Sequence, residues 1–569
     1  MSLTGALNAA VASLRVNQAS IQVMSANIAH VNDPNYTRKT LNRESMVLGE
    51  TQIGSVTIGS YSTAVNESLR KQMESLIART STTGAQDEYM SRVQQLLGTS
   101  TDQAALPNLL GQFNAAWQTL QATPESESAQ SAVIRYGEQL SNEIARVAAG
   151  LDAIDAEAKD DTAQSVGQLN SLLEQVFEIN VRLRSASENG AERTELLDQR
   201  DALVREVAKY VDVRTVEREN GAVALFTPAG LGLVDGPPST FTYDGTNVFR
   251  TEDPTTPVDA LLRDGKIRAL LDFRLDNSNK AVPVSTDPAT EVLRKLRSQL
   301  DAVVGALTST VGSTFSSAYD AAGQSLRIEA SFQTTVKAQP SSAQYSTISL
   351  TGDLRAGDVF EVEINGHVFS YTALDTDVTL DAIASKLTTL INSDTTLGVT
   401  ALAGAGALQL VGSAVDTPFS VTTLVNGELP ELKSGFFTGT DRFTFKVNQA
   451  LLDGTAQLKK NSASDVVNAL NSTDRTFVSA GLTVSGVSYK GMMVGIAGTA
   501  IANAKSISDQ AKFNTESLKQ TEQRYQADVG VNLDEEIANL QVLQNAYAAS
   551  ARLLTVIQQL FDTLQAALR

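Results

Sequence analysis

The sequence predicts a mainly α-helical, multidomain protein with β-rich outer domains, which places it in the α+β class. Three observations lead to this prediction. Apolar residues recur every seven positions at both ends of the chain, long helical patterns follow each end inwards, and Asn-Gly pairs separate strand-like runs in the middle. We expect the terminal helices to form a coiled coil, next to a long antiparallel helical bundle with an inserted β-containing α+β domain.

The two terminal helices are predicted from apolar stripes with seven-residue spacing. The first stripe consists of Leu7, Leu14, Ile21 and Ile28, with Val11 beside it, and the second of Leu533, Leu540, Tyr547, Leu554 and Phe561, with Ile537 beside it. Asn532, followed three residues later by Glu535, predicts the start of the last helix. These stripes are candidate packing residues, either within one chain or in a seam shared between subunits, since the spacing does not separate the two. Few Lys or Arg residues accompany them, which disfavours a membrane-surface helix.

The middle of the chain divides by pattern into three further regions. Helical spacing over 67–210, 285–324 and 479–525 predicts the bundle, while 1–66 with 526–569 forms the terminal domain. Residues 211–284 read as a small β-rich segment, with Asn220-Gly221 as a hairpin turn. Residues 325–478 read as an α+β outer insert, in which Asn365-Gly366 marks a second hairpin. The layout is nested, because the two ends of the chain are expected to fold together.

The composition excludes several classes of function. The formal charge of −19 disfavours nucleic acid as a partner, and the absence of cysteine excludes disulfides and thiolate metal sites. The chain has two histidines, far apart, and no phosphate-binding or nucleophile motif, so we expect no enzyme activity, catalytic residue, cofactor or metal. His30 is interpreted as a polar residue at a helix end and Trp117 as helical core. No basic N-terminal region or long apolar run predicts a cleaved signal peptide or membrane insertion.

The segment 25–38 resembles the sequence signature of a known protein family. It reads Ser-Ala-Asn-Ile-Ala-His-Val-Asn-Asp-Pro-Asn-Tyr-Thr-Arg, and it resembles the signature of bacterial flagellar rod, hook and hook-associated axial proteins at Asn27, Ile28, Ala29, Asn32, Pro34 and Tyr36. Pro34 is expected to end the first helix and to occupy the second position of a tight turn, with Asn35 in the left-handed region at the third. His30, Asp33 and Asn35 depart from the family pattern, which has Asn, Thr and Gly there.

The C-terminal residues are similar to one branch of that family. The segments 530–540, 544–552 and 560–564 resemble the pattern of hook-associated protein 1, the protein of the hook–filament junction, as do the internal segments 196–201 and 269–274. The resemblance implies a structural subunit that leaves the cell unfolded through the flagellar type III export apparatus, held beforehand by a cytoplasmic export chaperone. It also implies a secreted protein that forms a ring with itself between hook protein and hook-associated protein 3 and serves flagellum assembly and motility.

Two other functions stay open from the sequence. A hook or rod subunit would share the N-terminal signature, and an enzyme carried on a flagellar scaffold would need its site within 325–478.

Overall fold

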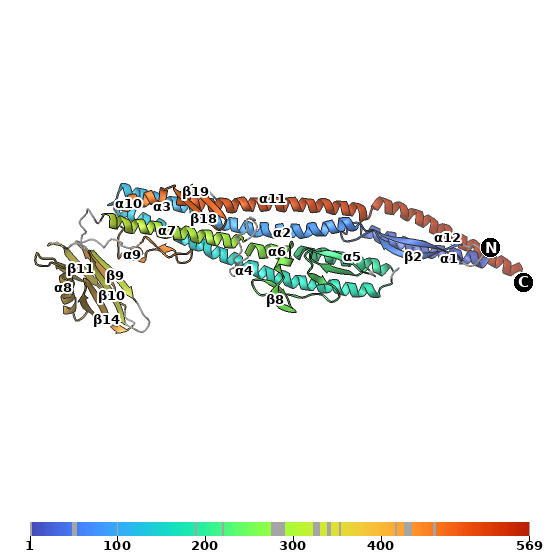
Figure 1. The fold of residues 1–569 in the computed structure, drawn as a ribbon. Coiled ribbons are helices and arrows are strands. Elements are labelled where there is room, and N and C mark those ends of the chain that lie inside the picture. Colours follow the sequence, from blue (N-terminus) through green and yellow to red (C-terminus); the bar gives the residue numbers. More distant parts are fainter. Residues whose placement is uncertain are drawn as a thin grey trace. The chain divides into compact units, whose positions relative to one another are not determined.

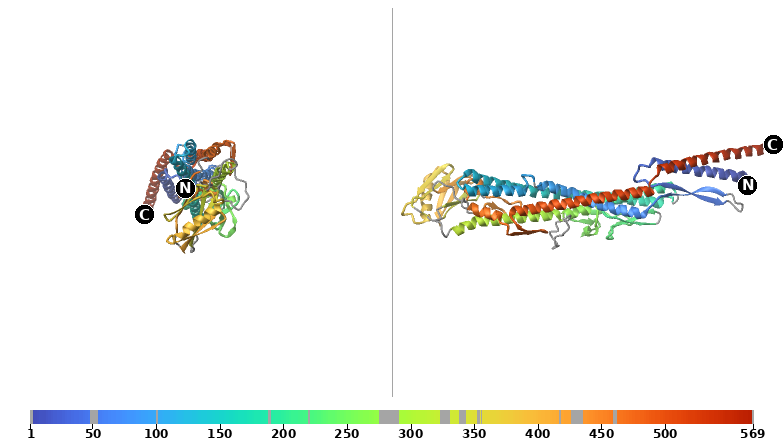
Figure 2. Two further views of the ribbon diagram at one scale, coloured as in Figure 1. Left: turned by 90° about the vertical axis from the view of Figure 1, so that its left-hand side faces the viewer. Right: turned by 90° about the horizontal axis from the view of Figure 1, so that it is seen from above.

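A computed structural model describes residues 3–47, 54–99, 101–187, 190–218, 221–274, 291–322, 331–337, 343–351, 354, 356–415, 418–425, 435–458 and 462–567 (Figures 1 and 2). The chain divides into two compact units. Unit 1 comprises Met1–Arg92, Ala153–Leu293 and Ala502–Arg569, and unit 2 comprises Val93–Asp152 and Arg294–Ile501. The predicted fold class is confirmed, since long helices dominate and all described strand pairs are antiparallel.

Unit 1 combines the two ends of the chain with helices and three small sheets. Its elements are α1 (Leu3–Ala29), β1 (Lys39–Val47), β2 (Gly54–Thr63), most of α2 (Glu67–Leu97), the second part of α4 (Glu127–Ser185), α5 (Ala191–Tyr210), β3 (Arg214–Glu217), β4 (Val223–Phe226), β5 (Gly232–Val234), β6 (Phe241–Tyr243), β7 (Val248–Arg250), β8 (Asp253–Pro257), the 3-10 helix η2 (Asp259–Leu261), α6 (Lys266–Arg274), the second part of α11 (Tyr489–Val529) and α12 (Leu533–Ala567). The sheets are β1-β2, β3-β4-β5 and β6-β7-β8.

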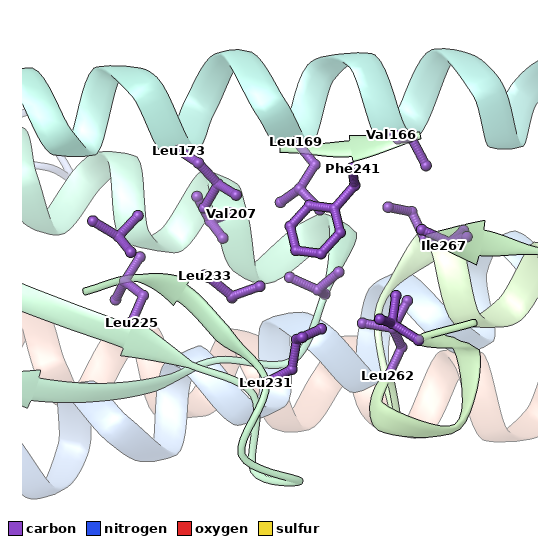
Figure 3. Packing of buried hydrophobic residues seen from close by; sticks show 14 of the residues in the cluster. Val166, Leu169, Leu173, Val207, Leu225, Leu231, Leu233, Phe241, Leu262 and Ile267 are labelled. Carbon is purple, nitrogen blue, oxygen red and sulfur yellow. The ribbon is translucent and has the colours of Figure 1, made fainter. Parts of the chain in front are cut away.

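The main core of unit 1 lies between α4, α5 and the strands that follow them (Figure 3). Leu169 and Leu173 of α4 point at Phe241 of β6 and Val207 of α5 in this core, and all four side chains are buried. The α4 residues recur at three- and four-residue intervals, which places them on one helix face. This core fixes the position of α5, which carries polar residues of the site described below.

Unit 2 contains the rest of the helices and strands. Its elements are the end of α2, α3 (Leu106–Ala122), the first part of α4, most of α7 (Val292–Ala322), β9 (Ser331–Lys337), β10 (Ala343–Thr351), β11 (Val359–Ile364), β12 (His367–Thr372), α8 (Leu380–Ser393), β13 (Val399–Gly404), β14 (Ala407–Val415), β15 (Val421–Val425), β16 (Phe437–Thr438), β17 (Lys446–Val447), α9 (Gln449–Leu452), α10 (Ala463–Asn471), β18 (Arg475–Ser479), β19 (Leu482–Val487) and the first part of α11.

An outer module of unit 2 has a core of its own, formed by residues 348–425. Its sheets have the strand orders β13-β14-β10-β9 and β12-β11-β15, and α8 contributes Ile383, Leu387 and Ile391 to the shared core. The predicted hairpin at Asn365-Gly366 is confirmed: the residues have φ values of 53° and 85°, as a two-residue turn of this kind requires.

Phe436, Phe437 and α10 lie outside this module core and pack on α3 instead. The ring of Phe436 lies 5.4 Å from Phe113 and 5.7 Å from Trp117, both of α3, and α10 packs against the same helix. Trp117 is fully buried there, as its interpretation as helical core predicts. The insert drawn from the sequence at 325–478 therefore contains two structurally different parts.

Two local predictions need correction. Strands begin at Lys39, not near Val211, because β1 and β2 form an antiparallel hairpin inside the segment assigned to the terminal helical domain. The turn after α1 is present, with the Tyr36 amide donating to the Asp33 carbonyl at 3.2 Å, but Asn35 does not adopt a positive φ. The Asp33 carboxylate instead accepts from the Asn35 amide at 2.9 Å, so this turn needs no glycine.

Candidate assembly site

The two terminal helices pack against each other in unit 1 (Figure 1). On α12 the most deeply buried residues are Glu536, Leu543 and Ile557, at seven-residue multiples along one face. Ser550 completes this row, and its hydroxyl hydrogen-bonds that of Ser13 on α1 at 3.2 Å. The buried α1 residues are small or short, which allows the two backbones to approach closely; they are Ala10, Val16, Asn17, Ala19, Ser20 and Asn27.

The packing residues predicted from sequence divide between half-buried and exposed positions. The half-buried ones are Leu7, Val11, Leu14, Ile21, Ile28, Leu540, Leu554 and Phe561, and the exposed ones are Leu533, Ile537 and Tyr547. The row of deepest burial on α12 thus runs through Leu543 and Ile557, beside the stripe chosen from the sequence. Helical geometry places Leu554 and Phe561 on this same α1-facing side, within about 40° of Leu543.

A second apolar row on α12 remains exposed. Val542, Leu553, Val556, Leu560 and Leu564 are 66%, 53%, 51%, 51% and 56% exposed, and at 100° per residue they lie on a flank turned away from Leu543. We call these five residues the outer row. Between Ile537 and Phe561 the helix has one charged residue, Arg552. A solvated helix face normally carries many charges, so an apolar, nearly uncharged face is typical of an interaction surface. The sequence could have predicted the outer row, because its apolar residues from Leu553 to Leu564 are spaced three and four positions apart.

The end of α1 is held by a buried amide that makes four hydrogen bonds. Asn27 Nδ2 donates to the Lys39 carbonyl at 2.9 Å and to Glu536 Oε2 at 3.1 Å, and Asn27 Oδ1 accepts from Tyr36 Oη at 2.9 Å and from the Lys39 amide at 3.1 Å. Its side chain is completely buried. An amide offers two donors and two acceptor positions, and all four are used, so Asn27 joins α1, the signature turn, β1 and α12.

Lys39 and the acidic residues of α5 form the other half of this hub. Lys39 Nζ lies 2.6 Å from Glu195 Oε2 and 3.4 Å from Asp198 Oδ2, and 4.5 Å from the centre of the Tyr36 ring. The hydroxyl of Thr37 donates to Asp198. Burial raises the pKa of the Asp198 carboxyl to about 6, against the opposing effects of Thr37 and Lys39. Burial also raises the pKa of Tyr36, helped by the negative charges of Asp198, Glu195 and Glu536.

The other signature residues lie around this hub. Ile28 is half-buried, whereas Ala29, Asn32 and Pro34 are exposed. The Pro34 carbonyl accepts from Gln526 Nε2 of α11 at 2.6 Å, and the Arg38 amide donates to the Val529 carbonyl at 2.8 Å. His30 stacks on Tyr36 at 4.7 Å with about half of its side chain exposed, as expected for a polar residue after a helix end.

The start of α12 is fixed where the sequence predicts it. Asn532 Oδ1 accepts from the amides of Asp534 and Glu535 at 3.1 and 3.3 Å, which caps the helix. The Arg38 guanidinium lies 3.2 Å from Glu535, so the signature turn also contacts the first turn of α12.

A second buried ionic cluster joins α2, α5 and β3. Arg70 is 1% exposed, and its guanidinium lies 3.2 Å from Asp201 and 2.9 Å from Glu217. Arg200 lies 2.6 Å from Asp201 and donates to the Gly221 carbonyl. Asp198, Arg200 and Asp201 all belong to the segment 196–201 that supports the family resemblance. The polar residues of that segment therefore have structural roles, which local spacing could not indicate.

The described part of the chain contains no cluster of His, Asp and Glu residues suited to a metal ion. Among its helices, none has an apolar stretch long enough to cross a lipid bilayer. The features described here are a packing hub around Asn27 and an exposed apolar face on α12.

Models of two flagellar protein regions match parts of this chain. Residues 90–327 match the model of the flagellar hook-associated protein FlgK helical domain, and residues 522–567 match that of the flagellar basal body rod FlgEFG protein C-terminal region. Flagellar hook-associated protein 1 of Salmonella typhimurium is 27% identical over 594 aligned residues, which cover 99% of each chain. This chain is a relative of flagellar hook-associated protein 1.

Two further relatives and one solved structure are also similar to this chain. Flagellar hook-associated protein 1 of Escherichia coli is 24% identical with 99% of each chain covered, and that of Bacillus subtilis is 24% identical over 38% of this chain and 45% of its own. The structure of the flagellar hook junction protein FlgK from Burkholderia pseudomallei aligns with 80% of this chain and 99% of its own, with 14% identity and a TM-score of 0.46. The chain is a structural component of the flagellum.

Proposed function

We propose that this chain is a structural subunit of the hook–filament junction and that it assembles through the outer row of α12. The observation that carries the proposal is the outer row itself, five large apolar side chains that are more than half exposed on a helix segment with one charge. The α1 helix covers the face of α12 that carries Leu543 and Ile557, about 100° around the helix from the centre of the outer row, so the outer row is free to receive a neighbouring subunit.

The energetics favour a subunit seam at this surface. Burying a Leu or Val side chain that water now covers contributes about 1.5–3 kcal/mol when the burial is complete. Five such side chains in every subunit would give a ring a large hydrophobic driving force, of which ordering the subunits would consume a part. The exposed residues of the predicted stripe, Leu533, Ile537 and Tyr547, lie on the other side of the Leu543 row and do not belong to this contact.

The proposed partners follow from this role and from the family resemblance. They are further copies of the chain in a ring, hook protein below and hook-associated protein 3 above. Inside the cell, an export chaperone would cover α12, because an exposed apolar helix is prone to aggregate before export through the type III apparatus. The subunit would act outside the cell, at the junction.

A hook or rod subunit is the second candidate, because the rod-protein model matches residues 522–567. The match of residues 90–327 to the hook-associated helical domain favours the junction. Deleting the coding region separates the two. We expect cells with intact hooks and no filaments, seen by electron microscopy, and recovery of filaments when the gene is returned. Loss of hooks would favour a hook or rod subunit, and normal filaments would contradict any role in the junction.

A further inference from the structure

We infer that the β1–β2 hairpin is a second assembly surface, in which the free edge of β2 pairs with the β1 edge of a second copy of this chain. The inference rests on the proposed function, because it assumes that copies stand side by side. In the described part of the chain this sheet has two strands, so one edge of each strand carries main-chain groups that no further strand pairs. A two-stranded hairpin is marginal by itself, and free edges tend to recruit another strand.

The two edges differ in their protection against pairing. β1 carries the charged residues Lys39, Arg43 and Glu44. β2 is ten residues long and contains no charged residue and no proline, although 19% of the chain is charged. The bulge of this pair lies on β2, where Gly59 is the extra residue opposite Asn42 and Arg43. Charges are a usual device that prevents unwanted strand pairing, and β2 has none along the regular run 54–58 beyond its bulge. Val56 and Ile58, near the tip of β2, are 37% and 38% exposed.

The choice of partner edge follows from symmetry and from existing hydrogen bonds. Pairing β2 with the β2 of another copy would be isologous and would close after two subunits, whereas a ring needs two different edges. Pairing two β1 edges would be isologous as well, and the Lys39 end of that edge is already bonded to Asn27. Repeating the hairpin sideways places β2 next to the β1 of the following copy, and the new pair is antiparallel like the pair within one chain.

One face of the hairpin is ready to continue into such a sheet. The hydroxyls of Thr40 and Ser62 are 2.8 Å apart, and Asn42 Nδ2 donates to Ser60 and Ser62 at 3.1 and 3.2 Å. These short polar side chains form cross-strand pairs inside one hairpin, and the same pairs can form between copies. The hairpin packs on α1, which in turn packs on α12, so both proposed assembly surfaces belong to elements packed around α1.

Cysteine cross-linking tests the pairing on a chain that has no cysteine of its own. Two differently tagged copies, one with Asn42→Cys and one with Ser60→Cys, are expressed together in cells that lack the natural copy. Hook–filament structures are isolated and treated with a short bismaleimide. We expect covalent dimers that contain both tags, and no comparable dimers from either variant alone. Dimers from Ser60→Cys alone, or assembled structures without mixed dimers, would overturn the inference.

A charge on the edge supplies an independent test. Val56→Lys places an ammonium group on the exposed part of β2 opposite the uncharged Ser45, so it gains no ion pair with that residue in either strand pair and protects the edge. We expect an unchanged melting temperature and at least a tenfold lower yield of mixed dimers, whereas the control Val56→Thr should keep the yield. Equal yields from both variants would contradict the inference. If the chain is absent from isolated flagellar structures, the proposed function fails; if it is present without these links, only the hairpin inference fails.

Discussion

At the scale of single residues, the signature is explained by a buried polar hub. Asn27 and Tyr36 carry hydrogen bonds that join four segments of the chain, whereas Asn32 and Pro34 shape the exposed turn between them. The resemblance pointed to these residues. Their partners could not be found from sequence, because Asn27 bonds Glu536 across 509 positions and Lys39 bonds Glu195 across 156. Local patterns contain no information on contacts of that separation.

Replacing Asn27 tests the hub directly. Asn27→Ala removes four hydrogen bonds. The buried Tyr36 hydroxyl, Glu536 carboxylate and Lys39 amide then lack this partner. We therefore expect a loss of about 2–4 kcal/mol in the free energy of unfolding. Urea unfolding followed by circular dichroism measures it. Asn32→Ala, an exposed position of the same signature, is the control and should change stability by about 0.5 kcal/mol or less. Equal effects of the two substitutions would contradict the hub.

The buried carboxylate of Asp198 predicts a pH dependence. Burial raises the pKa of Asp198 in the folded state to about 6, above its ordinary value near 4, so the folded state binds the proton more tightly. Stability from this group is therefore fully present below about pH 4 and is lost as the pH rises through 6. Between pH 4.5 and 7, the melting temperature of Asp198→Asn should change less with pH than that of the exposed control Glu192→Gln. The same slope in both variants would show that Asp198 is not the group responsible.

Burial raises the pKa of Glu74 to about 6 as well, so part of the slope should remain in Asp198→Asn.

At the scale of elements, periodicity predicted the long helices and the Asn365-Gly366 hairpin well. It did not show which face of α12 would meet α1, since the buried row includes the polar residues Glu536 and Ser550, whose partners are Asn27 and Ser13. The β1–β2 hairpin was missed for a related reason. β1 alternates poorly, with charged and amide side chains at Lys39, Asn42, Arg43 and Glu44, so its sequence does not present an apolar face.

The α12 helix should be the least protected long helix of the free subunit. Its described packing partner is α1, and much of its surface is exposed to solvent. Residues 166–183 of α4, in contrast, contribute to the main core of unit 1. We expect amides of 544–564 to exchange with deuterium at least a hundredfold faster than those of 166–183 in the monomer, and to slow on assembly. Equal protection of the two segments at low protein concentration would contradict the claim that α12 is weakly protected until the subunit assembles.

At the scale of the whole molecule, the predicted insert divides into a module with its own core and a segment that packs on α3. The outer module has its own core from Ile348 to Val425, whereas Phe436 and α10 belong with α3. The sequence predicts an α+β insert over 325–478 from its turns and short strands. It did not reveal where the insert ends, because the contact between Phe436 and Trp117 joins residues that are distant in the sequence.

Two deletions test this division. Replacing 331–425 by a short flexible linker should leave the helical circular-dichroism signal and the main melting transition in place. Replacing 325–478 also removes Phe436 and Phe437 from the aromatic cluster of Phe113 and Trp117, so we expect a melting temperature several degrees lower, as loss of about 3–5 kcal/mol per large core aromatic would produce. Similar melting of both deletions would contradict this division of the insert.

The central claim, that the outer row of α12 is a subunit seam, is tested most directly by a matched pair of double variants in cells that lack the natural copy. Leu553→Asp with Leu560→Asp alters the outer row, and Leu543→Asp with Ile557→Asp alters the row that faces α1. For the outer pair we expect an unchanged melting temperature of the purified subunit and hooks without filaments in electron micrographs, since a buried, unpaired carboxylate costs several kcal/mol per subunit. The inner pair should destabilise the subunit itself. Normal filaments together with an unchanged melt for the outer pair would contradict the seam.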